Sequence, residues 1–356
     1  MKVGIFLDFC YPGEVRNAYQ RYLGAVEQVQ LAEEVGFDEA FFAEHHFLDN
    51  GWEIMPNPLI FAHDIARRTK RMTIGPASVI LTQWNPIRLA EDIAVTDLLT
   101  DGRLRVGLGR GYRFTELAGW GVSTKEHENR ELFEESLEII LKAWTEDYLT
   151  HKGPNYEYPG PEYPERDKGI MVVPKPLQKP HPPLFMTVFQ KSTLESAARR
   201  GYGVVLAIIP NPVLREYVRA YYDAARSAGH DVELGEKVTI ARVCYVADSD
   251  RQARQDIEVH LKTFWRMAGP QVARGLPAGM VEPDADGGFS PPFETLQNIN
   301  VIAGTPGHCL EQFHRLKEET GVGTVWLAPD ITNLDHEKTM QNIRNIGKIL
   351  PEIQAL

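Results

Sequence analysis

The residues best suited to take part in a reaction are Glu44-His45-His46, which directly follow an apolar run over residues 40–43. Three titratable side chains in a row do not suit a strand interior, so a predicted strand ends there. Imidazole has an ordinary pKa near ~6.5, which makes His45 a candidate general acid or base at neutral pH. The alternative is a solvated strand end at which the histidines only cap hydrogen bonds. The stretch alone does not decide between them.

Candidate anion-binding residues lie after two other predicted strands. Arg110 directly follows an apolar run, and Arg130 opens the next long helix. Gln190, Ser192 and Thr193 lie at a helix start, where N–H groups and hydroxyls can hold a phosphate. Taken singly, the Ser-Thr pair is also typical of a plain N-cap, and the arginines of surface ion pairs. Together, one base, one phosphate-binding site and an apolar cleft favour a phosphorylated cofactor of flavin size.

Aromatic residues near the same strand ends indicate an apolar or aromatic substrate. The expected walls of a substrate pocket are Phe47, Trp84, Tyr112, Phe114 and Trp265. We also expect Tyr112, together with Ala77 and Ser78 at the end of another strand, to lie beside the cofactor. The alternative for the aromatic residues is an ordinary core position, where large rings are often found.

Eight short apolar runs, alternating with helical patterns, are predicted to position these residues. The predicted strands are residues 3–7, 40–43, 72–81, 104–108, 184–188, 204–209, 238–246 and 323–327. The predicted helices are residues 19–35, 57–65, 86–99, 131–144, 192–200, 212–228, 248–265, 305–319 and 336–350. Buried strands that alternate with helices indicate a parallel sheet. Eight such units fit an α/β fold of the (β/α)8 TIM-barrel type, whose active sites lie at the C-terminal ends of the strands.

Two irregular insertions interrupt the pattern, at residues 148–183 and 267–300. The first is too rich in proline for regular helix, and long loops like the second are often active-site lids. Pro76 should bend or end the third strand. Since no change in composition divides the chain, we predict a single domain over residues 1–356. The alternative is an open doubly wound sheet, suggested by Gly107 to Tyr112, but Tyr112 stands where the third glycine of a dinucleotide-binding pattern belongs.

Composition narrows the choice of partners. The chain has 356 residues and a net charge of −11, which argues against nucleic acid or an anionic membrane as partner. The three cysteines, at positions 10, 244 and 309, lack metal-binding spacing and suit a reducing compartment. Met1-Lys2 leads directly into an apolar run, and no apolar stretch approaches the ~20 residues needed to span a bilayer. We therefore expect a cytoplasmic protein with no signal peptide and no metal site.

Several motifs, in order and spacing, resemble those of the bacterial luciferase-like flavin-dependent monooxygenase family. They include the opening Lys2-Val3-Gly4-Ile5-Phe6, Gly36-Phe37-Asp38 before Glu44-His45-His46, Gly102-Arg103-Leu104-Arg105-Val106-Gly107 before Arg110-Gly111, and Gly304-Thr305-Pro306. The resemblance covers essentially the whole chain. It implies a (β/α)8 barrel, a homodimer, and reduced FMN as co-substrate delivered by a separate flavin reductase.

The resemblance also implies roles for individual residues. His45 matches the catalytic histidine and Glu44 the acidic residue beside the flavin. Arg110 and Arg130 match basic residues near the flavin phosphate and ring. Ser192 and Thr193 match the phosphate-binding turn. A non-prolyl cis peptide bond under the flavin would fall at Ala77-Ser78. Two positions depart from the luciferase alpha chains, which makes light emission doubtful: Gly109 replaces a reactive cysteine, and Phe189 replaces a glutamate.

The function implied is oxygenation of a small apolar or aromatic substrate by reduced FMN and O2 through a peroxyflavin, with His45 exchanging protons and His46 in a structural role. The type of substrate is open between an aldehyde, a ketone, a thioether and an amine. Two alternatives use the same barrel: hydride transfer with a deazaflavin, and flavin binding without catalysis. A metal hydrolase built on His45 and His46 fits less well, because neighbouring strand residues diverge and no third ligand is visible.

Overall fold

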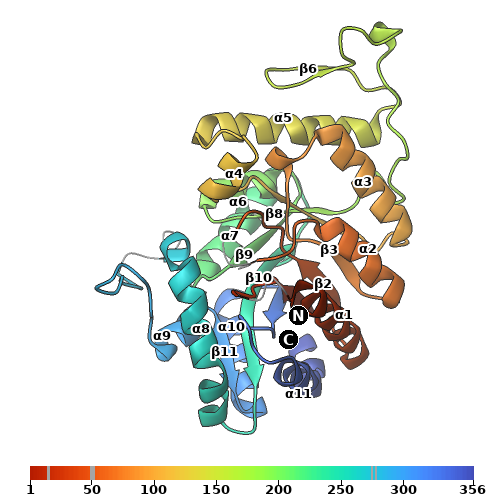
Figure 1. Ribbon diagram of the computed structural model, residues 1–356. Coiled ribbons are helices and arrows are strands. Elements are labelled where there is room, and N and C mark those ends of the chain that lie inside the picture. The colour runs from red at the N-terminus through yellow and green to blue at the C-terminus, as the bar shows by residue number, and fades with distance from the viewer. Residues whose placement is uncertain (14–16, 49–52, 274–275, 277–278) are drawn as a thin grey trace. The chain divides into compact units, whose positions relative to one another are not determined.

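The computed structural model describes residues 1–13, 17–48, 53–273, 276 and 279–356 (Figure 1). Gly275 and Pro277, which contribute to the second predicted insertion, lie outside the described residues. The chain forms two compact units. The first comprises Met1–Phe41, Asn50–Ile54 and Phe185–Leu356, and the second Phe42–Asp49 and Met55–Leu184.

The first unit alternates parallel strands with helices. Its elements are β1 (Lys2–Leu7), α1 (Ala18–Val35), β2 (Glu39–Phe42), β8 (Leu184–Thr187), α6 (Lys191–Arg199), β9 (Gly203–Ala207), α7 (Asn211–Ser227), β10 (Val238–Val246), α8 (Asp250–Val272), α9 (Phe293–Ile299), β11 (Val301–Gly304), α10 (Pro306–Thr320), β12 (Thr324–Ala328) and α11 (His336–Gln354). The last residue of β2 and the first of β8 belong to the second unit.

The second unit holds the shorter strands and the longest insertion. Its elements are α2 (Pro58–Arg68), β3 (Thr73–Pro76), β4 (Val79–Ile80), a 3-10 turn at Leu81–Gln83, α3 (Pro86–Leu99), β5 (Val106–Gly109), α4 (Phe114–Gly119), α5 (Glu126–Thr145), β6 (His151–Lys152), β7 (Glu157–Tyr158) and a 3-10 turn at Arg166–Lys168. Strands β6 and β7 form a small antiparallel hairpin, visible beside α5 in Figure 1.

The strands of the sheet follow the order β3-β2-β1-β12-β10-β9-β8-β5-β4, and β11 pairs with β10. The pairing is parallel wherever its register is defined, for example between β1 and β12 and between β10 and β9. Long β10 pairs with β9 and β12 along residues 238–243 and with β11 along residues 243–246. Parallel strands linked by helices agree with the predicted α/β architecture.

The apolar core of the first unit contains an aromatic stack. The rings of Phe41 and Trp326 lie 4.1 Å apart between centroids, and Phe185 meets Trp326 edge-on. The buried indole N–H of Trp326 donates to Glu39 Oε2 at 2.8 Å, so the polar atom inside this core has a partner. The stack fills the space between strands that are distant in sequence.

Helix ends agree with the turn residues of the sequence. Helix α10 starts at Thr305, whose side chain accepts from the backbone N–H of His308, and Pro306 occupies the first turn. Gly36 ends α1 at φ 114°, a left-handed value that glycine adopts without a Cβ clash. No helix among the described residues combines the length and apolar character needed to cross a bilayer.

Several predicted boundaries are wrong. Helix α5 begins at Glu126, five positions before the predicted start, because charged residues hide its first turn from an apolar pattern. The predicted insertion at 267–300 is shorter than expected, since α8 continues to Val272 and α9 fills Phe293–Ile299. Strand β11 and helix α4 were not predicted, because elements of four and six residues carry almost no periodicity. The third strand does break after Pro76, as expected.

Candidate active site

The Glu-His-His stretch lies just beyond the end of β2 in the second unit, and each histidine bonds a different carboxylate. His45 Nδ1 lies 2.8 Å from Glu116 Oε1, and His46 Nε2 lies 3.0 Å from Glu44 Oε1. Since a carboxylate can only accept, both facing ring nitrogens carry a proton. In neutral His45 the unprotonated nitrogen is therefore Nε2, the atom able to take up a proton.

Glu116 was not among the predicted residues. It lies in α4 and is almost fully buried; its Oε1 also accepts from the backbone N–H of His46 at 3.2 Å, and Arg113 Nε lies 3.9 Å from the same oxygen. Such a carboxylate fixes the orientation and tautomer of His45. The sequence signal that could have identified Glu116 is its position. It is an acidic residue six positions after Arg110, in the segment that follows the predicted strand 104–108.

Glu44 is only 1% exposed and joins three parts of the second unit. Besides His46, its Oε1 accepts from the indole N–H of Trp84 at 2.9 Å, and its Oε2 accepts from the backbone N–H of Ile80 at 3.2 Å. Three donors compensate the cost of burying this carboxylate. Glu44 therefore holds the end of β2, the start of the 3-10 turn and the Trp84 ring in one arrangement.

The peptide bond between Ala77 and Ser78, which connects β3 and β4, is cis. Gly109 of β5 is paired with Ile80 of β4. A Cβ atom at Gly109 would lie 2.8 Å from Ile80 Cδ1 and 3.2 Å from Ser78 Cβ. The side chains around position 109 therefore fit the glycine that replaces the cysteine of the luciferase alpha chains. A cysteine at this position would require the Ile80 side chain to move.

Aromatic side chains surround the two histidines. Tyr112 is 51% exposed and meets the ring of His45 edge-on, with the centroids 6.4 Å apart. Trp120, which was not predicted, contacts the rings of both His46 and Phe47, each with the centroids 5.3 Å apart. Phe47 is half exposed and Phe114 more so, while Trp84 is half-buried. This grouping of accessible rings suits an apolar or aromatic ligand.

Trp265 differs from the other aromatic candidates. It lies on α8 in the first unit and is fully buried in an apolar cluster formed with α9, β11 and the end of β10. Its side chain has no surface to offer a substrate, so we leave it out of the proposed pocket. Trp265 instead occupies an ordinary core position, which was the alternative for the predicted aromatic residues.

Arg110 and Arg130 converge on one carboxylate of the second unit. Glu126 Oε1 lies 2.9 Å from Arg110 Nη2 and 2.8 Å from Arg130 Nη2. The hydrogen bond from Arg110, helped by that from Arg130, lowers the pKa of the Glu126 carboxyl. Arg130 lies within the first turns of α5 rather than at its start. Two guanidiniums held together could receive a phosphate, with Glu126 as a competing anion.

The predicted phosphate-binding turn forms the start of α6 in the first unit. Gln190 is the N-cap residue and makes no capping hydrogen bond through its side chain, and Ser192 and Thr193 lie in the first turn. That turn contains no acidic residue. Gln190 and Ser192 are exposed and Thr193 is half-buried, so the hydroxyls and the first N–H groups suit an anion.

The sequence matches the family described as luciferase-like monooxygenase over residues 1–324. The chain belongs to this family. A relative, the oxygenase component of the flavin-dependent trigonelline monooxygenase of Acinetobacter baylyi, is 26% identical over an alignment of 363 positions, which spans 99% of this chain and 95% of the relative. These matches confirm the predicted family and the predicted enzyme class, a flavin-dependent monooxygenase.

Two solved structures show the fold of this luciferase-like chain. The FMN complex of the oxygenating constituent of 3,6-diketocamphane monooxygenase from Pseudomonas putida superposes with a TM-score of 0.79 at 23% identity, covering 98% of this chain and 97% of that one. An F420-dependent secondary alcohol dehydrogenase, in complex with an F420-acetone adduct, gives a TM-score of 0.75 at 17% identity over 99% and 98% of the two chains. The predicted α/β barrel is confirmed.

Among the described residues, no group of three or more His, Cys, Asp or Glu side chains is placed to hold a metal ion. His45 and His46 each have a carboxylate partner instead.

Proposed function

We propose that the chain is the oxygenase component of a two-component monooxygenase. It would take reduced FMN from a separate flavin reductase and, with O2, oxygenate a small apolar or aromatic organic substrate. The observation that carries the proposal is the His45–Glu116 pair, which lies among accessible aromatic rings just beyond a barrel strand. We further propose a homodimer located in the cytoplasm.

The proposed roles follow from the contacts of each residue. Reduced FMN, when bound, supplies the electrons that activate O2. His45 accepts or returns a proton at Nε2, while Glu116 holds the opposite nitrogen in its protonated form. Glu44 keeps Trp84 and the segment after the Ala77-Ser78 peptide in place. Tyr112, Phe47, Phe114 and Trp84 exclude water and contact the substrate.

For the cofactor itself we propose two kinds of contact. Gln190, Ser192 and Thr193 bind the phosphate through the start of α6, where no acidic side chain opposes an anion. Arg110 and Arg130 add positive charge for the phosphate or the electron-rich ring. Ala77 and Ser78 support the flavin ring.

An anaerobic titration tests the cofactor assignment. Photoreduced FMN and a reduced deazaflavin are added separately to the purified chain, and binding is followed by absorbance and fluorescence. We expect saturable binding of reduced FMN and, on admission of air with an aldehyde, ketone, thioether or amine, formation of an oxygenated product. Tight binding of the deazaflavin with hydride transfer and no O2 consumption would establish the alternative. Flavin binding without product from any class would favour a non-catalytic relative.

A further inference from the structure

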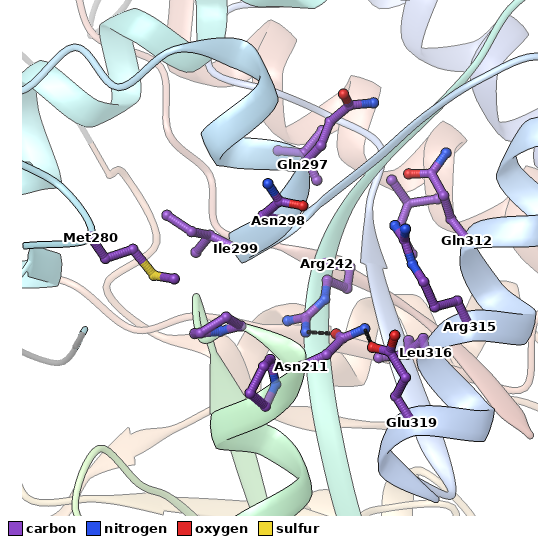
Figure 2. Close-up of a pocket in the computed structure, with 14 residues that line it drawn as sticks. Asn211, Arg242, Met280, Gln297, Asn298, Ile299, Gln312, Arg315, Leu316 and Glu319 are labelled. Atoms are coloured by element: carbon purple, nitrogen blue, oxygen red, sulfur yellow. Dashed lines mark hydrogen bonds between the residues drawn. The ribbon is translucent and has the colours of Figure 1, made fainter.

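A cavity of about 420 Å³ lies entirely within the first unit (Figure 2). Helices α7, α9 and α10 and strands β10 and β11 contribute to its lining, and none of its lining residues belongs to the set proposed for flavin or substrate. A volume of this size is enough for a small organic molecule. It therefore needs an explanation of its own.

Arg242 of β10 is the buried cation of this cavity. It is only 4% exposed, and its guanidinium donates to the carbonyl oxygens of Ile209 and Ala241 and to Asn211 Oδ1 at 3.0, 3.2 and 3.3 Å. All three acceptors are neutral, and no carboxylate of the described residues lies within ion-pair distance. These bonds engage three of its five N–H donors. A buried guanidinium without a counter-charge favours an anionic ligand.

Glu319 also lines the cavity, and its carboxylate is bonded by Asn211 rather than by Arg242. Asn211 receives the hydrogen bond from Arg242 and donates its own side-chain N–H to Glu319 Oε2 at 2.8 Å, as the dashed lines in Figure 2 show. A second cation, Arg315 of α10, lines the same cavity and forms no ion pair within the described parts of the chain. The cavity thus contains two guanidiniums, only one of them buried.

The rest of the lining combines amides with apolar side chains. Gln297 and Asn298 offer hydrogen bonds, while Met280, Ile299 and Leu316 present apolar surface (Figure 2). The side-chain amide nitrogen of Gln312 already donates to the carbonyl oxygens of Ala303 and His308. The start of α7 also borders the cavity, and its first turn contains no acidic residue. An inorganic anion would use the cations and leave the apolar surface wet. A carboxylate with an apolar body would use both, because a planar guanidinium pairs with a carboxylate through two parallel hydrogen bonds.

We propose that this cavity is a binding site for a small organic carboxylate that carries an apolar group, with Arg242 and Arg315 as its anion-binding residues. The site is independent of the proposed flavin chemistry. Burial lowers the pKa of the Arg242 guanidinium to about 9, and an anion beside it would favour its charged form.

Calorimetric titration of the purified full-length chain with benzoate tests the proposal, with benzamide as the uncharged ligand of similar shape. We expect benzoate to bind in roughly the millimolar range or tighter and benzamide not to bind measurably. Arg315→Gln should weaken benzoate binding roughly five- to tenfold, and Arg242→Gln at least about tenfold. Arg344→Gln, which removes an exposed positive charge from α11, is the matched control and should change nothing.

Two further variants keep the result decisive. Asn298→Trp, at an exposed lining position, should block the cavity and abolish benzoate binding even if Arg242→Gln fails to fold. His45→Ala should leave benzoate binding unchanged, which separates this site from the proposed active site. Equal binding of benzamide, or benzoate binding that survives both Arg315→Gln and Asn298→Trp, would overturn the proposal. Displacement of bound benzoate by inorganic phosphate at a similar concentration would also overturn it.

Discussion

Two histidine–glutamate pairs in the second unit have nearly the same nitrogen–oxygen distance but different surroundings. His45 Nδ1 lies 2.8 Å from Glu116 Oε1, and His151 Nε2 lies 2.9 Å from Glu135 Oε1. Both carboxylates are buried. Distance and burial therefore do not tell a catalytic pair from a structural one, and the other contacts of each carboxylate must be compared.

The carboxylate of Glu135, on α5, accepts several hydrogen bonds from the segment of the β6–β7 hairpin. In addition to His151, it accepts from the backbone N–H groups of Asn155 and Tyr156 at 3.0 Å each, and from the Asn155 side chain at 2.7 Å. These bonds fasten the β6–β7 hairpin to α5. The His45 pair instead lies beside the exposed ring of Tyr112, beyond the end of a barrel strand. We infer that the His151–Glu135 pair anchors the hairpin, and for the His45–Glu116 pair we propose proton transfer.

Replacement of His45 should give the largest effect. For His45→Ala we expect product formation with reduced FMN to fall by about 10²–10⁴-fold, the usual contribution of a general acid–base group. The affinity for reduced FMN should remain within about twofold in the anaerobic titration. His45→Gln, which can still donate to Glu116, is the matched control for folding and should be equally inactive. A variant with full turnover would remove the proposed distinction between the two pairs.

Replacement of Glu116 should have the next largest effect. A hydrogen bond to a charged group contributes about 1.5–3 kcal/mol, so Glu116→Gln should lower turnover by about ten- to a hundredfold. Because Glu116 acts through His45, the pH profile of turnover should shift toward lower pH, since the imidazolium loses its carboxylate partner. A merely structural role would lower activity without moving that profile, and this outcome would contradict the assignment of Glu116 as a positioning residue.

Replacement of Glu135 should affect stability rather than turnover. Loss of its charged hydrogen bonds in Glu135→Gln should cost about 1–3 kcal/mol of unfolding free energy at pH 7, measured with urea, while turnover stays within about twofold. Although burial alone raises the pKa of the Glu135 carboxyl, the bonds from His151, Asn155 and Tyr156 lower it overall. A depressed pKa stabilises the fold above the unfolded value near ~4.3 and loses that contribution as pH falls. The variant should therefore lose less stability on acidification than the parent chain.

Sequence patterns predicted the fold well because most strands are continuous apolar runs bounded by proline, glycine or capping residues. Thr305-Pro306 and Gly36, for example, mark helix boundaries by local chemistry alone. Short elements without periodicity were missed, and one of them, α4, carries Glu116. The catalytic candidate could thus be found from sequence, while its carboxylate partner depends on a tertiary contact between residues 45 and 116.

Trp265 illustrates the opposite error. An aromatic residue near a predicted loop suggested a pocket wall, but its helix continues to Val272, so the ring lies inside the packed region of α8 rather than at its end. A helix boundary misplaced by a few residues is enough to exchange a surface position for a core position. Assignments that depend on a chemically distinctive group, such as His45, tolerate such shifts better than those that depend on an apolar ring.

Replacement of Glu126 should have the smallest effect. Its carboxylate is 64% exposed and is bound by two arginines, whereas Glu116 and Glu135 are buried and each is bound by a histidine. Exposed ion pairs contribute about 0.2–1 kcal/mol, so Glu126→Gln should leave stability nearly unchanged. If Arg110 and Arg130 bind the flavin phosphate, removal of the competing carboxylate should tighten FMN binding by about two- to fivefold, and riboflavin, which lacks the phosphate, should bind as before. Glu128→Gln, at a half-buried glutamate of the same helical turn that pairs with Lys125, is the matched control. Weaker FMN binding in Glu126→Gln, or an equal gain for riboflavin, would show that the arginines and Glu126 form only a surface network.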